Sequence, residues 1–318
     1  MMAVESCPVT AIVPAWRRRE RLLETLRRIQ NCRPAPAEIL VHVDGGSAEM
    51  VEAVRQWNPD VRILTSDSLL GPGGARNRLV GAASHELVAN FDDDSFPAHD
   101  DYFARVTRLA ARFPDAAAYS AASHEKEWRS LRFQRIAMPS GCGCVFRKSW
   151  FARTRGFVPL PVAYNMEEVD IGLQLHALGG VIVHDPLLRV VHDHALPREV
   201  DAEINARVLA NTALFPFLRF PAWLWPAGAW SVLRRVGLLL CWGWTGGLWR
   251  GLQMIPEHLA HHQQHRRAVS TAALLSWLLL KRRPENLGDA EVSSLNSENP
   301  PGWEIRSTHG AAESGLPP

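Results

Sequence analysis

Two spacings of apolar residues alternate along the first half of the chain. Short runs of mostly aliphatic residues are typical of strands, and longer stretches with an apolar residue every three or four positions are typical of amphipathic helices. The expected strands are residues 10–13, 39–43, 61–65 and 87–91, and the expected helices are residues 18–30, 48–57, 75–83 and 100–113. Strands that alternate with helices in this way predict an α/β fold built on a parallel sheet.

The pattern is less regular from residue 116 to residue 191. Residues 116–146 predict strands that are interrupted by an exposed, charged excursion at residues 124–135. Residues 167–178 predict a helix that ends at Gly179 and Gly180. The following run, residues 181–191, predicts a pair of strands broken at Pro186.

The composition changes after about residue 200. Seven of the twelve tryptophans fall between residues 223 and 277, interleaved with leucines and arginines. This mixture suits a membrane interface, where indoles lie at headgroup depth and arginines reach phosphates. The apolar runs at residues 236–249 and 268–280 are both shorter than the ~20 residues of a membrane span. The sequence therefore predicts a peripheral membrane contact, with packing on the rest of the chain or a homodimer contact as the alternatives.

Past Pro284 the sequence is rich in Ser, Asn, Glu, Gly and Pro, which predicts a disordered tail. The expected organisation is a catalytic domain at residues 1–200, a helical extension at residues 201–283 and a tail at residues 284–318.

The overall composition is that of an ordinary globular protein. A hydrophobic content of 47% indicates a globular protein with a sizeable core, and a net charge of +2 gives no reason to expect nucleic acid as a partner. The five cysteines lack zinc-ligand spacing, and Cys142 and Cys144 lie in a small-residue run that predicts a tight strand. No basic-then-apolar segment opens the chain, so we expect a cytoplasmic protein. A solvated helix face is expected for His258, His261, His262 and His265.

Three adjacent carboxylates, Asp92, Asp93 and Asp94, directly follow the expected strand at residues 87–91. Like charges at a strand end repel, so a divalent cation shared with a diphosphate is the expected partner. An acidic turn that caps the helix at residue 100 is the alternative. Polar turns also follow the second and third strands, at residues 44–47 and 71–77, and Val13-Pro14-Ala15-Trp16 ends the first strand. Because ligands collect at the carboxyl ends of parallel strands, these turns predict one site at one sheet edge.

In this order the motifs resemble those of the family 2 glycosyltransferases, which are inverting enzymes of the GT-A fold that use nucleotide sugars. The resemblance covers about residues 8–200. Its elements are Ile12–Trp16 with Arg18, Asp44-Gly45-Gly46-Ser47, Gly74-Ala75-Arg76-Asn77, Asp92-Asp93-Asp94, Gly156-Phe157 and Glu167-Glu168-Val169-Asp170.

The resemblance implies a GT-A fold with a mixed, mostly parallel sheet and assigns roles to particular residues. It implies a divalent metal, Mn²⁺ or Mg²⁺, at Asp92, Asp94 and His192, and a catalytic base at Glu168 near Asp170. The residues that it implies for nucleotide-sugar binding are Pro14, Ala15, Trp16, Arg18, Asp44, Arg76, Asn77, Asp92 and Asp93.

Several positions depart from the family pattern. Ala15 and Trp16 replace a threonine and a tyrosine, and Gly45 replaces the second aspartate of the base-binding turn. Glu168 stands where the family has its catalytic aspartate, and Gln174 stands where an arginine normally follows. Trp16 could still stack on a base, but the nucleotide preference is left open.

The expected function is metal-dependent transfer of a sugar, with inversion, from a nucleoside diphosphate to a hydroxyl acceptor. The base takes the proton of the hydroxyl as it attacks, and a metal neutralises the leaving diphosphate. The expected acceptor is a lipid-linked or polysaccharide glycan of a bacterial envelope or exopolysaccharide pathway, reached at the inner face of the membrane. A nucleotidyltransferase is one alternative, although it usually carries a Gly-rich basic loop where this chain has residues 14–16. A degenerate sugar-nucleotide binding module is the other.

Overall fold

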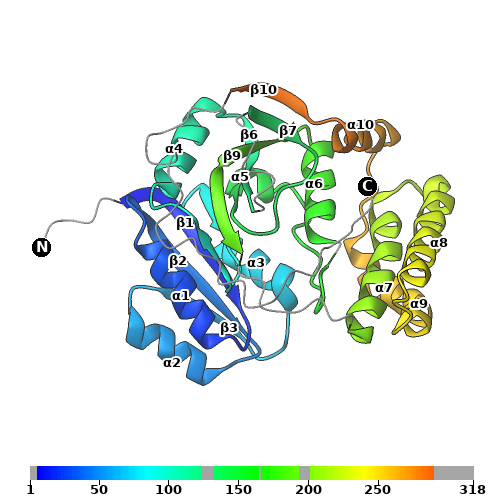
Figure 1. Cartoon of the computed structure of the whole chain (residues 1–318), viewed down its shortest axis with the longest axis horizontal. Coiled ribbons are helices and arrows are strands. Elements are labelled where there is room, and N and C mark those ends of the chain that lie inside the picture. Colours follow the sequence, from blue (N-terminus) through cyan, green and yellow to red (C-terminus); the bar gives the residue numbers. More distant parts are fainter. Residues whose placement is uncertain (1–5, 124–131, 165, 193–200, 290–318) are drawn as a thin grey trace, which may run out of the picture.

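The computed structural model describes residues 6–123, 132–164, 166–192 and 201–289, and it has one large mixed sheet at its centre (Figure 1). The first four strands are parallel and confirm the α/β prediction. They are β1 (Ser6–Ala15), β2 (Ala35–Asp44), β3 (Arg62–Ser66) and β4 (Leu87–Asn90).

The second half of the sheet is mainly antiparallel. Its strands are β6 (Ala116–Ala122), β7 (Arg132–Ile136), β8 (Cys144–Arg147), β9 (Val181–His192) and β10 (Glu285–Asp289), and the short β5 (Ser95–Pro97) pairs with β9. The strand order is β10-β7-β9-β6-β8-β4-β1-β2-β3, in which β8 joins the two halves by running antiparallel to both β4 and β6. The antiparallel β8 therefore places the loop before it, residues 137–143, beside the carboxyl end of β4.

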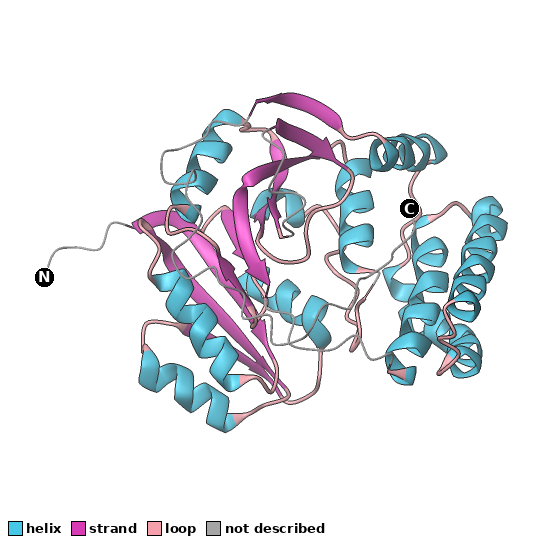
Figure 2. Cartoon of the chain, in the orientation of Figure 1, coloured by secondary structure: helices cyan, strands magenta, loops and turns pink. Residues whose placement is uncertain are grey.

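Helices cover both faces of the sheet (Figure 2) because alternate strand residues point to opposite sides. Ala11 and Val13 of β1 pack into one core, and Ile12 between them packs into the other. The first core is closed by α1 (Arg19–Gln30), α2 (Ala48–Trp57) and α4 (Tyr102–Arg112). The second is closed by α3 (Gly71–Ala82), α5 (Lys148–Phe151) and α6 (Glu167–Ala177).

Three local predictions differ from the structure. The helix expected at residues 75–83 begins at Gly71, because the Asp44 carboxylate accepts hydrogen bonds from the backbone N–H groups of Leu70 and Gly71. Residues 181–191 belong to one strand, since Pro186 lies at an irregularity of the β6–β9 register, where no ladder bond is needed. Residues 140–143 form a loop rather than a strand, and β8 begins at Cys144.

Helices also make up the C-terminal extension. Their bounds are α7 (Ala202–Arg219), η2 (Ala222–Leu224), α8 (Trp225–Cys241), α9 (Leu248–His262), η3 (Gln263–His265) and α10 (Thr271–Arg282). Leu214 and Leu218 of α7 share a core with Met166, and Trp277 of α10 shares another with Leu173 of α6. Among the described residues, no helix is both long enough and apolar enough to cross a membrane. The domain boundaries stay a prediction, and the extension packs directly on the helix that carries the candidate base.

Two parts of the C-terminal region were predicted incorrectly. Residues 285–289 form β10 on the edge of β7, although they fall in the segment expected to be disordered, and residues 290–318 lie outside the described residues. His262 is buried rather than solvated, and His258 Nε2 shares a hydrogen bond with Asn211 Oδ1 over 3.0 Å. Burial lowers the pKa of both histidines to about 4.

The charged excursion expected at residues 124–135 falls outside the described residues, apart from residues 132–135 in β7.

Candidate active site

The three aspartates after β4 diverge. Asp92 forms an ion pair with Arg76 of α3, whereas Asp94 forms ion pairs with Arg18 and with His192 Nε2, the latter at 3.2 Å. Asp93 turns toward the start of α1, where Arg18 Nη2 lies 2.5 Å from its carboxylate and the Trp16 backbone N–H donates to it. Asp92 and Asp94 therefore face the sheet edge, and Asp93 holds the β1–α1 turn.

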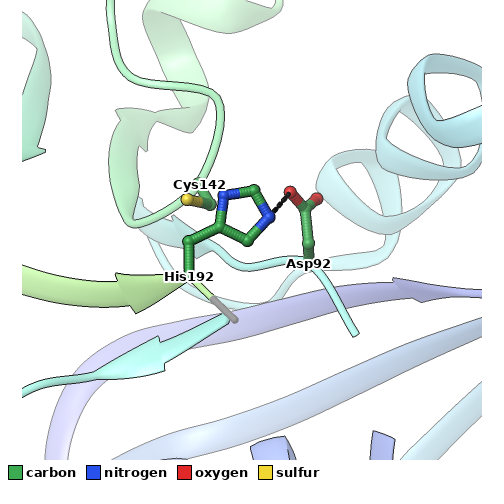
Figure 3. A group of neighbouring side chains, drawn as sticks. All are labelled: Asp92, Cys142 and His192. Atoms are coloured by element: carbon green, nitrogen blue, oxygen red, sulfur yellow. Dashed lines mark ion pairs between the residues drawn. The ribbon is translucent and has the colours of Figure 1, made fainter. Parts of the chain in front are cut away.

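His192 completes the group that was predicted to bind metal. It is the last residue of β9, and its Nε2 lies 3.8 Å from Asp92 and 3.2 Å from Asp94. Figure 3 shows that Cys142 joins it from the loop before β8, and one ligand atom each of Asp92, Cys142 and His192 lie within 4.8 Å of one another. Carboxylate, imidazole and thiolate are all donors for first-row divalent metals. The residues present fit such an ion, and sequence reasoning missed Cys142 because its spacing carries no metal signature.

The charges at this edge are already arranged for a cation. Burial alone would raise the pKa of Asp94, but the hydrogen bond from His192 and the charge of Arg18 bring that pKa below its ordinary value. Burial alone would lower the pKa of His192, but Asp94 and Asp92 bring it above its ordinary value. Burial raises the pKa of Asp93 to about 7. The His192 imidazole thus occupies the electrostatic position that a divalent ion would take.

Arg76 links the metal side of the site to helix α6. It is buried, and its guanidinium forms ion pairs with Asp92 and Glu167 and donates from Nε to Asn90 Oδ1 at 2.9 Å. Burial works against the charge, but the two carboxylates raise the pKa of Arg76. Arg76 was predicted to bind the nucleotide sugar, and the structure gives it the additional role of fixing Asp92.

Glu168 lies in the first turn of α6 and lines one cavity with Arg76, Glu167 and Gly141. A side chain at Gly141 would clash with Glu168 Oε1, so the glycine makes room for the carboxylate. Burial raises the pKa of Glu168, and its own backbone N–H and the charge of Arg76 counteract that effect. A carboxylate with a raised pKa is a stronger base than an exposed one, which suits proton abstraction.

Asp170 does not share this environment. Both of its oxygens accept hydrogen bonds from Arg219, the last residue of α7, and Gln174 donates to one of them at 2.8 Å. Both Asp170 and Arg219 are buried. These hydrogen bonds anchor α6 to the extension, and the catalytic role predicted for Asp170 stays a prediction.

We expect Arg219→Ala to lower the free energy of unfolding by ~3–5 kcal/mol, because the substitution leaves the Asp170 charge buried without its partner. Urea unfolding followed by circular dichroism measures the change. The matched control is Arg207→Ala, which removes the half-exposed ion pair with Glu203 and should cost ~0–1 kcal/mol. Equal losses in the two variants would contradict the anchoring role.

The remaining residues that were predicted to bind the nucleotide sugar fall into two groups. Trp16 is 45% exposed at the end of β1, with the Arg17 guanidinium 4.4 Å above its ring, so it presents a flat surface at the sheet edge. Pro14 and Ala15 are buried within β1 and offer only backbone there.

Asp44 and Asn77 are engaged within the fold. The Asp44 carboxylate is occupied by Ser66 and the start of α3. Asn77 exchanges two hydrogen bonds with the Phe157 backbone and thereby holds the segment ahead of α6. Their predicted contacts with a nucleotide sugar stay predictions.

Residues 10–165 match the family model described as glycosyl transferase family 2. They form a family 2 glycosyltransferase domain. The match contains the three aspartates, Arg76 and Cys142, whereas Glu168, His192 and Arg219 follow it along the chain.

Similar proteins agree with the family. A succinoglycan biosynthesis protein, ExoO of Rhizobium meliloti (strain 1021), is 31% identical over 137 residues, which cover 41% of this chain and 38% of that protein. The chain thus matches well under half of this relative. A mannosyltransferase from Pyrobaculum calidifontis, solved with GDP-Man and Mn²⁺, is 17% identical, with a TM-score of 0.55 and 87% of each chain covered. GalNAc-T7, solved with UDP, GalNAc and Mn²⁺, is 13% identical with a TM-score of 0.52, over 67% of this chain and 48% of that one. These two likenesses confirm the GT-A fold.

Proposed function

We propose that the protein transfers a sugar, with inversion at the anomeric carbon, from a nucleoside diphosphate sugar to a hydroxyl acceptor. The observation that carries the proposal is the Glu168–Arg76–Asp92 arrangement. One buried guanidinium lies between the carboxylate of the aspartate cluster and the first turn of α6, where Glu168 stands. This arrangement couples the place where a diphosphate would leave to the place where a hydroxyl would lose its proton.

The proposed chemistry divides between two groups of residues. A divalent ion held by Asp92, Asp94 and His192 would neutralise the charge that develops on the leaving diphosphate. Glu168 accepts the proton of the acceptor hydroxyl as its oxygen attacks the anomeric carbon, and Arg76 keeps Asp92 oriented throughout. The two similar solved structures contain Mn²⁺ with a nucleotide or nucleotide sugar, which supports the same class of metal and donor here.

We propose a lipid-linked or polysaccharide glycan as acceptor, and a cytoplasmic enzyme that works at the inner face of the membrane. The match to a succinoglycan biosynthesis protein supports a polysaccharide pathway. The experiment is to incubate the full chain with Mn²⁺ or Mg²⁺, a panel of nucleotide sugars and a membrane extract, and to analyse the products by mass spectrometry and the new linkage by NMR. Hydrolysis or transfer of none of the donors would overturn the proposal in favour of a binding module.

Trp16 should supply the stacking surface for the donor base. We expect Trp16→Ala to weaken nucleotide binding about tenfold or more, because base–aromatic stacking is worth ~1–3 kcal/mol. Isothermal titration calorimetry with a nucleoside diphosphate and Mn²⁺ measures the change without any acceptor. Trp150→Ala is the control, since Trp150 also carries a stacked arginine, Arg153, at 4.1 Å but lies on α5. Equal affinity of the Trp16 variant and the wild type would place the base elsewhere.

A further inference from the structure

The outer side of α8 is apolar and uncovered. Trp230, Leu233 and Leu240 lie on one side of the helix by their spacing, and they are 66%, 62% and 53% exposed. The opposite side packs on α7, where a Cβ atom added at Gly228 would come within 2.6 Å of Pro216. Helix α8 therefore lies close against α7 and at the outer edge of the extension in Figure 1.

More exposed tryptophans flank this helix. Trp223 precedes it and is 66% exposed, Trp242 and Trp244 follow it with ring centroids 5.1 Å apart, and Trp249 lies in the first turn of α9. Single exposed apolar side chains are ordinary on a protein surface, but a helix face with several of them, flanked by further exposed tryptophans, marks a site of interaction. Indole is also the side chain that prefers the boundary between water and hydrocarbon, because its ring is apolar and its N–H is polar.

Basic residues greatly outnumber acidic residues around the exposed tryptophans, although Arg207, Arg219 and Arg250 pair with Glu203 or Asp170. Residues 204–284 contain ten arginines and lysines but one acidic residue, Glu257. Arg234 lies one turn from Trp230, and within the described part of the chain it has no carboxylate partner. Burial and the charge of Arg234 lower the pKa of Lys281, so the basic end of α10 lies near the same face. Clustered cations with no acidic neighbour repel one another and are stabilised by an anionic partner.

We propose that the α8 face, defined as Trp230, Leu233, Arg234 and Leu240 together with Lys281 of α10, docks on a bilayer that contains anionic lipids. Tryptophan and leucine enter the headgroup region, while Arg234 and Lys281 approach lipid phosphates. A second copy of the chain fits this face less well, because a symmetric contact would place two copies of the same basic face opposite each other, and the face itself contributes no acidic residue. The face lies outside the candidate active site, so this inference stands or falls independently of sugar transfer.

Flotation of the full chain with vesicles tests the proposal. We expect binding to vesicles of phosphatidylcholine with phosphatidylglycerol, and weaker binding to phosphatidylcholine alone. Raising the salt concentration should weaken binding to the anionic vesicles but not abolish it, because salt screens only the charged part of the attraction. Complete release by moderate salt would overturn the insertion of the tryptophan and leucine side chains.

Two paired variants separate the apolar and charged contributions. The Trp230→Ala/Leu233→Ala variant should bind anionic vesicles roughly a hundredfold more weakly, or about tenfold per side chain, whereas Leu69→Ala, an exposed leucine before α3, should bind like wild type. The Arg234→Glu/Lys281→Glu variant should lose most of the preference for anionic lipid, whereas Arg27→Glu/Arg28→Glu on α1 should keep it. Thermal melts confirm that each variant is folded.

Two further results would overturn the inference. One is equal vesicle binding by wild type and the Trp230/Leu233 variant. The other is a dimeric wild type, seen by light scattering, that becomes monomeric in this variant while neither protein binds vesicles; that result would assign the face to a second copy. Because neither measurement uses a sugar donor, loss of vesicle binding can be distinguished from loss of transfer.

Discussion

Glu168→Gln should lower kcat by about 10²–10⁴-fold while leaving donor affinity unchanged, because the amide keeps the size of the side chain but cannot accept the acceptor proton. The environment favours Glu168 over its neighbours. It is half-buried beside Gly141, burial raises its pKa, and among the described residues no ion pair occupies its oxygens. The variant is measured by initial rates at saturating donor, and by calorimetry for nucleotide binding.

The neighbouring carboxylates are the matched controls for this prediction. Glu167 is paired with Arg76 through Oε2, and both oxygens of Asp170 are paired with Arg219, so each of these carboxylates is held by a buried guanidinium group. Asp170→Asn should therefore act on stability more than on kcat. Normal turnover by Glu168→Gln together with a large loss of kcat in Asp170→Asn would show that the base is Asp170 and that the assignment is wrong.

Much of the fold was predictable because its determinants are local. The period of apolar residues located β1, α1, β2, α2 and β4 to within a few residues. The carboxyl ends of parallel strands meet at one edge, so the order of strands and turns along the sequence was enough to place the aspartates after β4 together with Trp16 after β1. The structure also brings His192 to Asp92 and Asp94, as the family resemblance implied.

The missed features depend on contacts between distant segments. Cys142 reaches the aspartate cluster only because β8 runs antiparallel to β4, and strand polarity has no local signature in that region. Asp93 resembles its neighbours in sequence, but the turn of the chain directs it to the Trp16 backbone as well as to Arg18, which also pairs with Asp94. Arg219 pairs with Asp170 across 49 residues. The one available signal was Gln174, which lacks the charge of the family's arginine and leaves Asp170 in need of a cation from elsewhere.

The glutamine at position 174 also bears on whether the domain is an active enzyme or only a sugar-nucleotide binding module. Loss of the arginine at position 174 made a binding module thinkable, but Arg219 supplies a guanidinium to Asp170 from helix α7. The anchoring of α6 is therefore retained by a different residue, and the C-terminal extension becomes part of what holds Glu168 in place. We infer that the extension and the family 2 domain act as one folded unit.

Asp94→Ala should abolish metal-dependent transfer, with a loss of two or more powers of ten, since the metal contributes several kcal/mol of charge stabilisation and each 1.36 kcal/mol changes the rate tenfold. Asp94 Oδ1 is buried and faces His192 Nε2. Because His192 would itself bind the metal, this oxygen is available to the same cation. Calorimetry with Mn²⁺ should show weakened binding, and chelation of the wild type should reproduce the loss of activity. Asp93→Asn is the control, because Asp93 turns to Arg18 and Trp16 and should retain metal binding. Undiminished Mn²⁺ binding by Asp94→Ala, with loss in Asp93→Asn, would reverse the roles of the two aspartates.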